Sequence, residues 1–323
     1  MSNALKILVT GGSGFIGRHL CRRLLHDGHD VHATSRRVIL GHAPGLTWHV
    51  ADFADVAAAH RVMTAVKPDI VYHLAGAVGA SPDPALVLPT LHSLLTSTVN
   101  LLLAARKCDC RRVILSGSLT EPTVDGDGTT PQAPYAAAKW AAAGYARMFY
   151  SLYGTPVVLL RPFMTYGPGQ ARTKLIPSVT LSLLRREPPR LSSGRYSSDW
   201  VYIADVIEGF VAAATTPGIE GKTIDLGTGH LVPMTDIVDR LVTIVGHDVT
   251  PEFGALPDRP GENLVSADTS VAAEDLGWQA KTPLEAGLRK TVSWYRLAKD
   301  AVLPNLVGNA FAYKGLEALQ LIV

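Results

Sequence analysis

"KILVTGGSGFIGRHL", at residues 6–20, joins an apolar run to four glycines and then to a helical pattern. The spacing Gly11-x-x-Gly14-x-x-Gly17 comes directly after a predicted strand and at the start of a predicted helix, which is the context of a phosphate-binding turn. Gly11 permits a tight turn, Gly14 lets the main chain approach a pyrophosphate, and Gly17 lets the helix pack closely against the sheet. The N–H groups at the helix start favour an anion. The stretch therefore predicts a dinucleotide-binding loop, because a turn that only needs positive φ would explain one or two of these glycines.

Short β-branched runs alternate with amphipathic stretches through the first half of the chain, which predicts a parallel sheet covered by helices. Strands are predicted at residues 6–10, 30–34, 69–75, 112–118 and 156–162, with helices at 17–28 and 94–107. From about Met164 the elements become shorter, and a late strand at 222–227 can rejoin the sheet. A second domain interleaved with the first is therefore expected. The stretch from Leu297 to Val323 is apolar without a clear period, and no element is predicted there.

The composition narrows the class of protein. A chain of 323 residues with 47% hydrophobic residues can bury a large core, and 30 basic against 28 acidic residues leave a net charge of only +2. Neither a nucleic acid nor a membrane surface is therefore expected as a partner. Cys21, Cys108 and Cys110 are too few for a disulfide framework, and no His/Cys cluster indicates a metal site. Since no signal peptide and no apolar run of ~18 residues is found, a soluble cytoplasmic protein is expected.

The end of the second predicted strand bears on the choice of cofactor. An NAD site places a carboxylate there to bind the ribose 2′-hydroxyl, but this chain has Ser35, Arg36 and Arg37. Guanidinium groups suit a 2′-phosphate better than a hydroxyl, so NADP(H) is predicted, with NAD(H) possible. The alternative for the two arginines is a solvated loop. The other cofactor-binding residues predicted are Phe15, Ile16, Asp52, Phe53, Leu74, Ala75, Gly76, Pro162, Tyr135 and Lys139.

Tyr135 and Lys139, in "PYAAAK", are four residues apart, so a helix places both side chains on one face. An ammonium close to a phenol lowers the tyrosine pKa, which would make Tyr135 a usable acid or base. Ser118, at the end of the strand "RVILSGS", can hold the reacting oxygen in line with Tyr135. A lone Tyr-x-x-x-Lys pair often arises by chance, but here it accompanies a glycine loop and a strand-end serine.

In this order, the chain contains "TGGSGFIG", "HLAGA", "SGS", "YAAAK", "RPFMTYGPGQ", "DWVYIADV", "RPGE" and "ADTSVAAEDLGW". Over about residues 5–296 it resembles the extended short-chain dehydrogenases/reductases, the group called NAD-dependent epimerases/dehydratases. The resemblance implies a Rossmann-type, doubly wound α/β domain over residues 1–163 plus about 204–230. It also implies a smaller, interleaved C-terminal substrate domain over 164–203 and 231–323, a nucleotide-sugar substrate, and a homodimer built through two helices per subunit.

The resemblance assigns roles to single residues. Ser118, Tyr135 and Lys139 match the family's catalytic triad, and Gly11, Gly14 and Gly17 match its cofactor loop. The substrate-binding residues that it implies are Ser118, Lys174, Leu175, Arg195 and Arg259, with Arg259 matching an arginine that meets the diphosphate of the sugar nucleotide.

Several positions depart from the family pattern. Sugar 4,6-dehydratases follow the triad serine or threonine with an Asp-Glu pair, whereas Leu119 and Thr120 follow Ser118 here, so dehydration is not expected. Met164 replaces the usual asparagine, and Ser198 replaces an arginine, although Arg195 is near. Both changes affect the expected diphosphate contacts. Because NADPH suits net reduction, Arg36 and Arg37 after the second strand favour reduction of a nucleotide-linked 4-keto sugar, in particular a 4-keto-6-deoxy sugar. The alternatives are a nucleotide-sugar 4-epimerase and, in another class, a non-catalytic dinucleotide sensor.

Overall fold

The computed structural model describes residues 4–39, 43–79, 81–122, 130–258 and 264–300, so Arg259 lies outside the described residues. Within these ranges, seven strands form one parallel sheet in the order β10-β6-β5-β4-β1-β2-β3. The strands are β1 (Lys6–Thr10), β2 (Asp30–Ser35), β3 (Leu46–Val50), β4 (Ile70–His73), β5 (Arg112–Ser116), β6 (Val157–Pro162) and β10 (Thr223–Leu226). The predicted parallel α/β fold is confirmed, and the late strand β10 joins the sheet beside β6.

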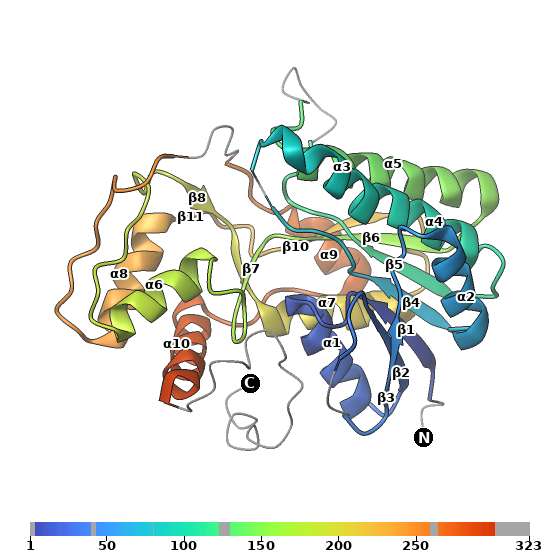
Figure 1. Ribbon diagram of the computed structural model, residues 1–323, viewed down its shortest axis with the longest axis horizontal. Helices are drawn as coiled ribbons and strands as arrows, with labels where there is room; N and C mark the ends of the chain where they lie inside the picture. Colours follow the sequence, from blue (N-terminus) through green and yellow to red (C-terminus); the bar gives the residue numbers. More distant parts are fainter. Residues whose placement is uncertain (1–3, 40–42, 80, 123–129, 259–263, 301–323) are drawn as a thin grey trace.

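Helices cover both faces of this sheet (Figure 1). One face packs against α1 (Phe15–His26) and α7 (Ile203–Thr215), and the other against α2 (Val56–Val66), α4 (Ser97–Ala105) and α5 (Pro134–Tyr153). Each face of the sheet has its own cluster of buried apolar side chains. The first core cluster lies on the face covered by α1 and α7, and the second lies on the face covered by α2, α4 and α5. Side chains alternate between the two faces along a strand, so Ile7 and Val9 belong to the first core cluster and Leu8 belongs to the second. Because both faces are covered, the strands are apolar almost throughout, as parallel strands usually are.

Short helical segments lead into α4. They are η1 (Pro84–Leu86), α3 (Val87–Thr90) and η2 (Leu91–Thr96), the last of which is a π-helix. By length and composition alone, the combined stretch Pro84–Ala105 could cross a membrane, with 39% of its most apolar window buried. Its α4 portion packs in the second core cluster through Leu101 and Leu102, as a core helix does.

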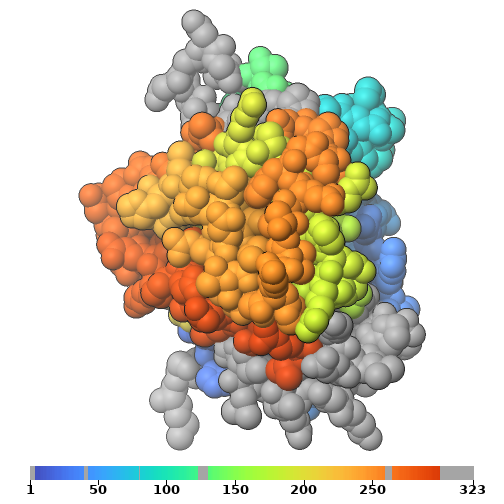
Figure 2. All heavy atoms as spheres, turned by 90° about the vertical axis from the view of Figure 1, so that its left-hand side faces the viewer, coloured from blue at the N-terminus to red at the C-terminus, as the bar shows by residue number. Residues whose placement is uncertain are grey.

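A smaller lobe lies beside the sheet and is built from separate segments of the chain (Figures 1 and 2). It contains α6 (Leu175–Leu184), α8 (Met234–Val245) and α10 (Leu284–Asp300), which pack on one another. Its short strands are β7 (Met164–Tyr166) paired in parallel with β9 (Trp200–Tyr202), and β8 (Ser197–Ser198) paired antiparallel with β11 (Val232–Pro233). Between α8 and α10 of this lobe, α9 (Thr269–Leu276) packs against β10 and α7. The chain thus returns to the sheet a second time, which the sequence pattern did not indicate.

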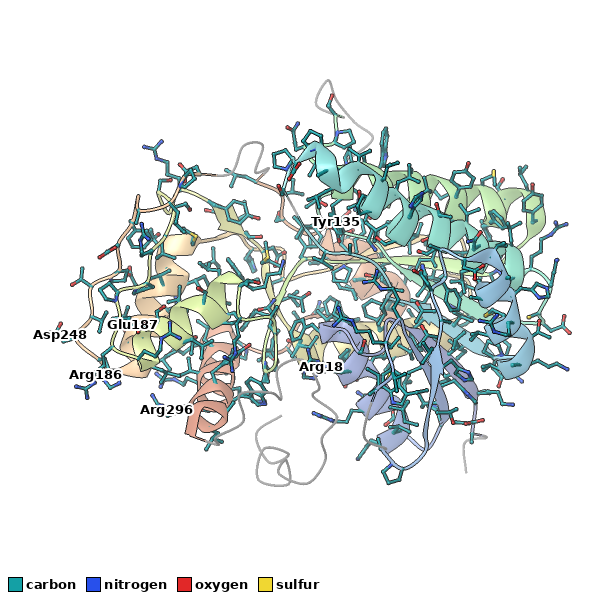
Figure 3. All side chains as sticks on the ribbon, in the orientation of Figure 1. Arg18, Tyr135, Arg186, Glu187, Asp248 and Arg296 are labelled. Carbon is teal, nitrogen blue, oxygen red and sulfur yellow. The ribbon has the colours of Figure 1, made fainter. Side chains whose placement is uncertain are left out.

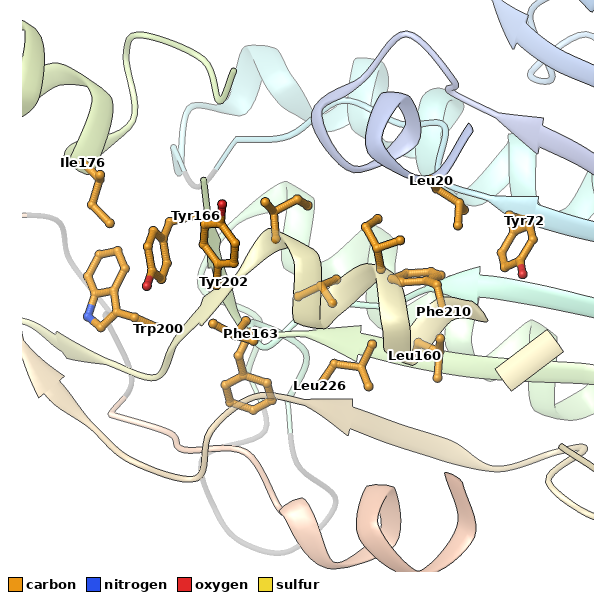
Figure 4. Close-up of a cluster of buried hydrophobic side chains, with 14 of the residues drawn as sticks. Leu20, Tyr72, Leu160, Phe163, Tyr166, Ile176, Trp200, Tyr202, Phe210 and Leu226 are labelled. Carbon is orange, nitrogen blue, oxygen red and sulfur yellow. The ribbon is translucent and has the colours of Figure 1, made fainter. Parts of the chain in front are cut away.

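The two lobes share one hydrophobic core (Figure 4). The first core cluster runs from Leu20 and Tyr72 beside the sheet, through Tyr202, to Ile176 and Trp200 in the smaller lobe. The rings of Tyr166 and Tyr202 meet edge to face with centroids 5.7 Å apart. Continuous apolar packing therefore fixes the smaller lobe against the carboxyl end of the sheet.

One buried carboxylate joins three separate segments at this junction. Asp199, just before β9, is fully buried and accepts hydrogen bonds from Thr228 N (2.8 Å), Thr228 Oγ1 (2.7 Å), Gly229 N (2.8 Å) and Ala267 N (3.1 Å). These donors come from the loop after β10 and from the segment before α9. Asp199 therefore links the smaller lobe to the returning chain.

We expect Asp199→Ala to lower the free energy of unfolding by about 3 kcal/mol, because buried N–H donors lose their acceptor at a cost of roughly 1–3 kcal/mol each. Urea-induced unfolding followed by tryptophan fluorescence measures this change. Asp239→Ala, on the exposed face of α8, is the control and should stay within about 0.5 kcal/mol of wild type. Equal stability of the two variants would contradict the role given to Asp199.

Candidate active site

The predicted site residues of the larger lobe gather at one edge of the sheet. Because the strands are parallel, the carboxyl ends of β1, β2, β4, β5 and β6 lie along the same edge. Those ends are Thr10, Ser35, His73, Ser116 and Pro162. In open parallel sheets, ligands bind outside the carboxyl ends of the strands.

The glycine loop lies between β1 and α1 and is tightly closed. Gly14 N donates to Gly11 O at 2.9 Å, and Gly11 has a φ of +69°. A Cβ on Gly11 would lie 2.8 Å from the main chain of Ala75, and one on Gly17 would lie 2.3 Å from Gly11 O. Both positions therefore require glycine. Gly17 permits the helix to approach the loop itself, a closer contact than the helix-to-sheet packing expected for it.

The loop fits the phosphates of a dinucleotide. A Cβ on Gly14, the N-cap residue of α1, would meet only Gly11 O, at 3.1 Å. No described side chain caps this helix, and its first turn contains no acidic residue. The N–H groups and the dipole of the first turn are thus directed at the space beside Gly14, where a phosphate would be stabilised.

The end of β2 is joined to the same loop. Ser35 Oγ accepts a hydrogen bond from Arg37 N at 3.2 Å and from Ser13 Oγ at 3.5 Å. Ser35 is buried, while Arg36 and Arg37 are exposed. Two arginines therefore follow a serine that contacts the glycine loop.

The strand ends of β1 and β4 are connected by hydrogen bonds. Thr10 Oγ1 lies 2.8 Å from His73 Nδ1 and accepts from Ala75 N at 3.2 Å, and Leu74 N donates to Thr10 O. Burial, with a smaller contribution from the charge of Lys139, lowers the pKa of His73 to about 3, so its ring is neutral. The segment after β4, which contains Leu74, Ala75 and Gly76, thus lies beside the glycine loop.

The remaining predicted cofactor residues are in different environments. Phe15 and Ile16 are half-buried at the start of α1, and Pro162 is buried at the end of β6. Asp52 is exposed and accepts from Ala54 N at 2.9 Å. Phe53 is buried in the second core cluster, so its ring belongs to the core, and a cofactor contact there would use its main chain.

The structure brings Ser118, Tyr135 and Lys139 together. Tyr135 lies in the first turn of α5 (Figure 3). Its phenol is within hydrogen-bonding reach of the Ser118 side chain. Lys139 follows one turn later and donates to Ser116 O at the end of β5. Ser118 Oγ also lies 3.0 Å from Thr120 Oγ1. Three hydroxyl groups, from Ser118, Thr120 and Tyr135, and one ammonium therefore lie close together at the end of β5.

The pKa values differ from the expectation that Lys139 lowers the pKa of Tyr135. Burial raises the pKa of the Tyr135 phenol, the Ser118 hydrogen bond opposes this, and the nearby Glu121 carboxylate raises it further. Burial also lowers the pKa of Lys139 to about 8, although Glu121 acts in the opposite direction. The lysine ammonium is hydrogen-bonded to Ser116 O. Desolvation is the largest influence on the pKa of the Tyr135 phenol. Tyr135 is therefore protonated at neutral pH and suited to donate a proton.

Two buried carboxylates near this site were not predicted. Glu121 accepts a hydrogen bond from Ser118 N at 2.6 Å. Asp225 on β10 accepts from Arg161 Nε at 2.6 Å and from Asp268 N at 3.2 Å. The sequence does show Glu121 as an acidic residue three positions after Ser118. The comparison with the dehydratase pattern covered only Leu119 and Thr120 and so did not include it.

Apart from Ser118, the predicted substrate residues lie in the smaller lobe or outside the described residues. Lys174 is the exposed N-cap residue of α6, and Leu175 is its half-buried first residue. Arg195 is exposed, in the loop before β8. Arg259 lies outside the described residues. The part of these four residues in substrate binding stays a prediction.

Comparison with known proteins identifies the family of this chain. The model of the NAD dependent epimerase/dehydratase family matches residues 7–227. UDP-glucose 4-epimerase of Mycolicibacterium smegmatis is 31% identical, over 90% of this chain and 99% of its own. dTDP-glucose 4,6-dehydratase of Neisseria meningitidis serogroup B is 28% identical, over 90% and 93%. The structure of UDP-glucuronic acid 4-epimerase from Bacillus cereus, in complex with UDP-glucuronic acid and NAD, has a TM-score of 0.82 at 25% identity, over 91% of this chain and 100% of its own. The matched region carries both the glycine loop and the Ser118, Tyr135 and Lys139 group, and the chain therefore belongs to the NAD dependent epimerase/dehydratase family.

Proposed function

We propose that the protein reduces a nucleotide-linked 4-keto sugar, in particular a 4-keto-6-deoxy sugar, with NADPH as the reductant. The observation that carries this proposal is the group formed by Ser118, Tyr135 and Lys139 at the carboxyl end of β5, beside a loop that fits a dinucleotide. The relatives named above act, by their names, on dTDP- and UDP-linked sugars, which supports a nucleotide sugar as substrate.

Each residue of this group has a separate task. Ser118 Oγ orients the carbonyl oxygen, and Tyr135 donates its phenolic proton to the oxygen as negative charge develops there. A raised pKa suits that direction of proton transfer, because the phenol stays protonated at neutral pH. Lys139 holds the nicotinamide ribose with its ammonium. The nicotinamide ring, when bound, supplies the hydride.

Substrate binding is assigned to the smaller lobe. We propose that Arg195, Lys174 and Leu175 of this lobe contact the substrate, and that Arg259, which lies outside the described residues, binds its diphosphate. Dehydration is not part of the proposal, because Leu119 and Thr120 offer no carboxylate where the 4,6-dehydratases have an Asp-Glu pair. A non-catalytic dinucleotide sensor would not need the Ser118, Tyr135 and Lys139 group.

A nucleotide-sugar 4-epimerase is the second candidate, favoured by the 31% identity to a UDP-glucose 4-epimerase. Mass spectrometry of the purified native protein, followed by incubation with a panel of nucleotide sugars, separates the two. The reductase releases its cofactor and consumes one NADPH per product. Retained NAD, together with interconversion of 4-epimers without added cofactor, would establish the epimerase and exclude the reductase. No turnover of any sugar, with a dinucleotide bound, would favour the sensor.

Tyr135→Phe should lower kcat by about 10²–10⁴-fold, because that factor is the usual contribution of a general acid. NADPH binding, measured by fluorescence titration, should stay near wild type. Tyr150→Phe, an exposed tyrosine at the far end of the same helix, is the matched control and should keep full activity. Normal turnover by Tyr135→Phe would assign the proton donor to another group.

We propose NADP(H) as the preferred cofactor, with the 2′-phosphate bound by Arg36 and Arg37 beside Ser35. The hydrogen bonds from Ser13 and Arg37 to Ser35 support this assignment, because they hold the arginine segment against the glycine loop. The alternative is NAD, which the solved Bacillus cereus relative contains.

Arg36→Ala should weaken NADPH binding by about 10- to 100-fold and leave NADH binding nearly unchanged, since a charge-assisted contact contributes roughly 1.5–3 kcal/mol. Calorimetric titration with both cofactors measures the difference. Arg61→Ala, on the exposed side of α2, controls for the loss of one surface charge. Equal losses for NADPH and NADH would refute the 2′-phosphate site.

We further propose a cytoplasmic homodimer that pairs through α5 and the segments α3 to α4. Apolar side chains are exposed along these adjacent helices, among them Leu88 (63% exposed), Leu103 (45%) and Trp140 (40%). Exposed apolar patches of this kind mark protein interfaces. The free thiols of the three cysteines agree with a reducing compartment.

Trp140→Glu should convert the dimer to a monomer, because a carboxylate that is buried in the interface without a partner is strongly unfavourable. Size-exclusion chromatography with light scattering measures the mass. Leu256→Glu, an exposed apolar position outside these helices, should leave the dimer intact. A monomeric wild-type protein would contradict the proposal.

A further inference from the structure

Glu121 has an unusual position for a carboxylate. It follows the strand-end Ser118 by three residues, is only 7% exposed, and accepts the Ser118 N–H at 2.6 Å. A Cβ on Gly117 would lie 2.7 Å from Glu121 Oε1 and 2.9 Å from Arg161 Cγ. The missing side chain at Gly117 therefore leaves the space that Glu121 and Arg161 occupy.

Charged groups from several elements surround this carboxylate. Glu121 interacts electrostatically with Lys139 and Arg147 on α5 and with Arg161 on β6. Arg161 is itself paired with Asp225 on β10. The ionisable groups that face Glu121 or Lys139 are Tyr135, Lys139 and Arg147 on α5, Arg161 on β6 and His73 on β4.

Side chains of alternating charge run from Lys139 through Glu121 and Arg161 to Asp225. Arg161 already has Asp225 as a hydrogen-bonded partner. Lys139 is hydrogen-bonded to the neutral Ser116 carbonyl, and His73 close by is neutral because burial lowers its pKa to about 3. Lys139 is bound to Ser116 O and Glu121 to Ser118 N, so the two charged groups are held at main-chain sites only two residues apart. Among the described residues, Glu121 is therefore the carboxylate that we take to act on Lys139.

We propose that Glu121 is a positioning residue that fixes the Ser118 main chain and holds the buried Lys139 in its charged form. Its hydrogen bond to Ser118 N orients the residue whose hydroxyl contacts Tyr135. Its negative charge compensates the desolvation of Lys139. The effect of Glu121 on catalysis rests on the function proposed above, whereas its effects on Ser118 and Lys139 do not.

The direction of the electrostatic effect can be stated. Burial lowers the pKa of Lys139 to about 8, and the Glu121 charge keeps it from falling further. Removal of that charge therefore lowers the pKa of Lys139, so the lysine loses its proton at a lower pH. The same change also lowers the pKa of Tyr135, because Glu121 raises it in the wild type. Both effects move the alkaline limb of a pH–rate profile to lower pH.

Glu121→Gln separates charge from shape, because the glutamine carbonyl can still accept the Ser118 N–H. Protein labelled with [ε-¹³C]lysine is titrated by NMR, and Lys139 is assigned by the resonance lost in Lys139→Gln. We expect the Lys139 midpoint near 8 in wild type and lower by roughly one pH unit in Glu121→Gln. Glu187→Gln, an exposed glutamate at the far end of the smaller lobe, should leave the midpoint unchanged (Figure 3).

An unchanged Lys139 midpoint in Glu121→Gln would overturn the proposal. If this variant does not fold, the wild-type resonance supplies a second test, because it should show a further small step at acid pH as Glu121 gains a proton. A single-step titration would overturn the proposal equally. The titration needs no substrate, so a shifted midpoint in a protein that does not reduce keto sugars would contradict the proposed function and leave the role of Glu121 intact.

Discussion

The common direction of the seven strands is the constraint on which the arrangement of the site depends. Parallel strands place the carboxyl ends of β1, β2, β4 and β5 along one edge, so the glycine loop, Ser35, the 74–76 segment and Ser118 become neighbours although they are far apart in sequence. The continuous apolar core then holds the smaller lobe against that edge. A hydrogen-bonded carboxylate, Asp199, secures the junction where the chain returns from the lobe to the sheet.

The part of the site around Ser118, Tyr135 and Lys139 contains buried charged groups, unlike the part that the glycine loop forms. Desolvation lowers the pKa of Lys139 to about 8 and raises that of Tyr135, so the lysine depends on compensation while the phenol stays protonated. Glu121 provides that compensation in our proposal, and Arg161 with Asp225 continues the network to β10. A buried ion network of this kind contributes little net stability unless each charge is paired, but it fixes the positions of its members.

Local patterns in the sequence predicted much of the fold and part of the site. The glycine spacing, the strand at residues 6–10 and the i, i+4 pair Tyr135 and Lys139 depend on neighbours along the chain, and the structure contains each of them. Apart from the return of the strand at 222–227 to the sheet, contacts between distant segments were not predictable. The donors to Asp199 come from residues 228, 229 and 267, and the packing of α9 depends on β10. The pKa direction of Tyr135 was wrong because it depends on burial, which the sequence does not show.

Isotope transfer from [4-²H]NADPH measures whether the site formed by Ser118, Tyr135 and Lys139 supports hydride transfer to C4 of a nucleotide-linked sugar. The wild-type protein is incubated with a nucleotide-linked 4-keto-6-deoxy sugar and each C4-deuterated stereoisomer of NADPH, and the product is analysed by mass spectrometry and NMR. We expect one deuterium at C4 from one of the two stereoisomers, with one NADP⁺ formed per product. A product without deuterium from either stereoisomer would contradict the proposed reduction.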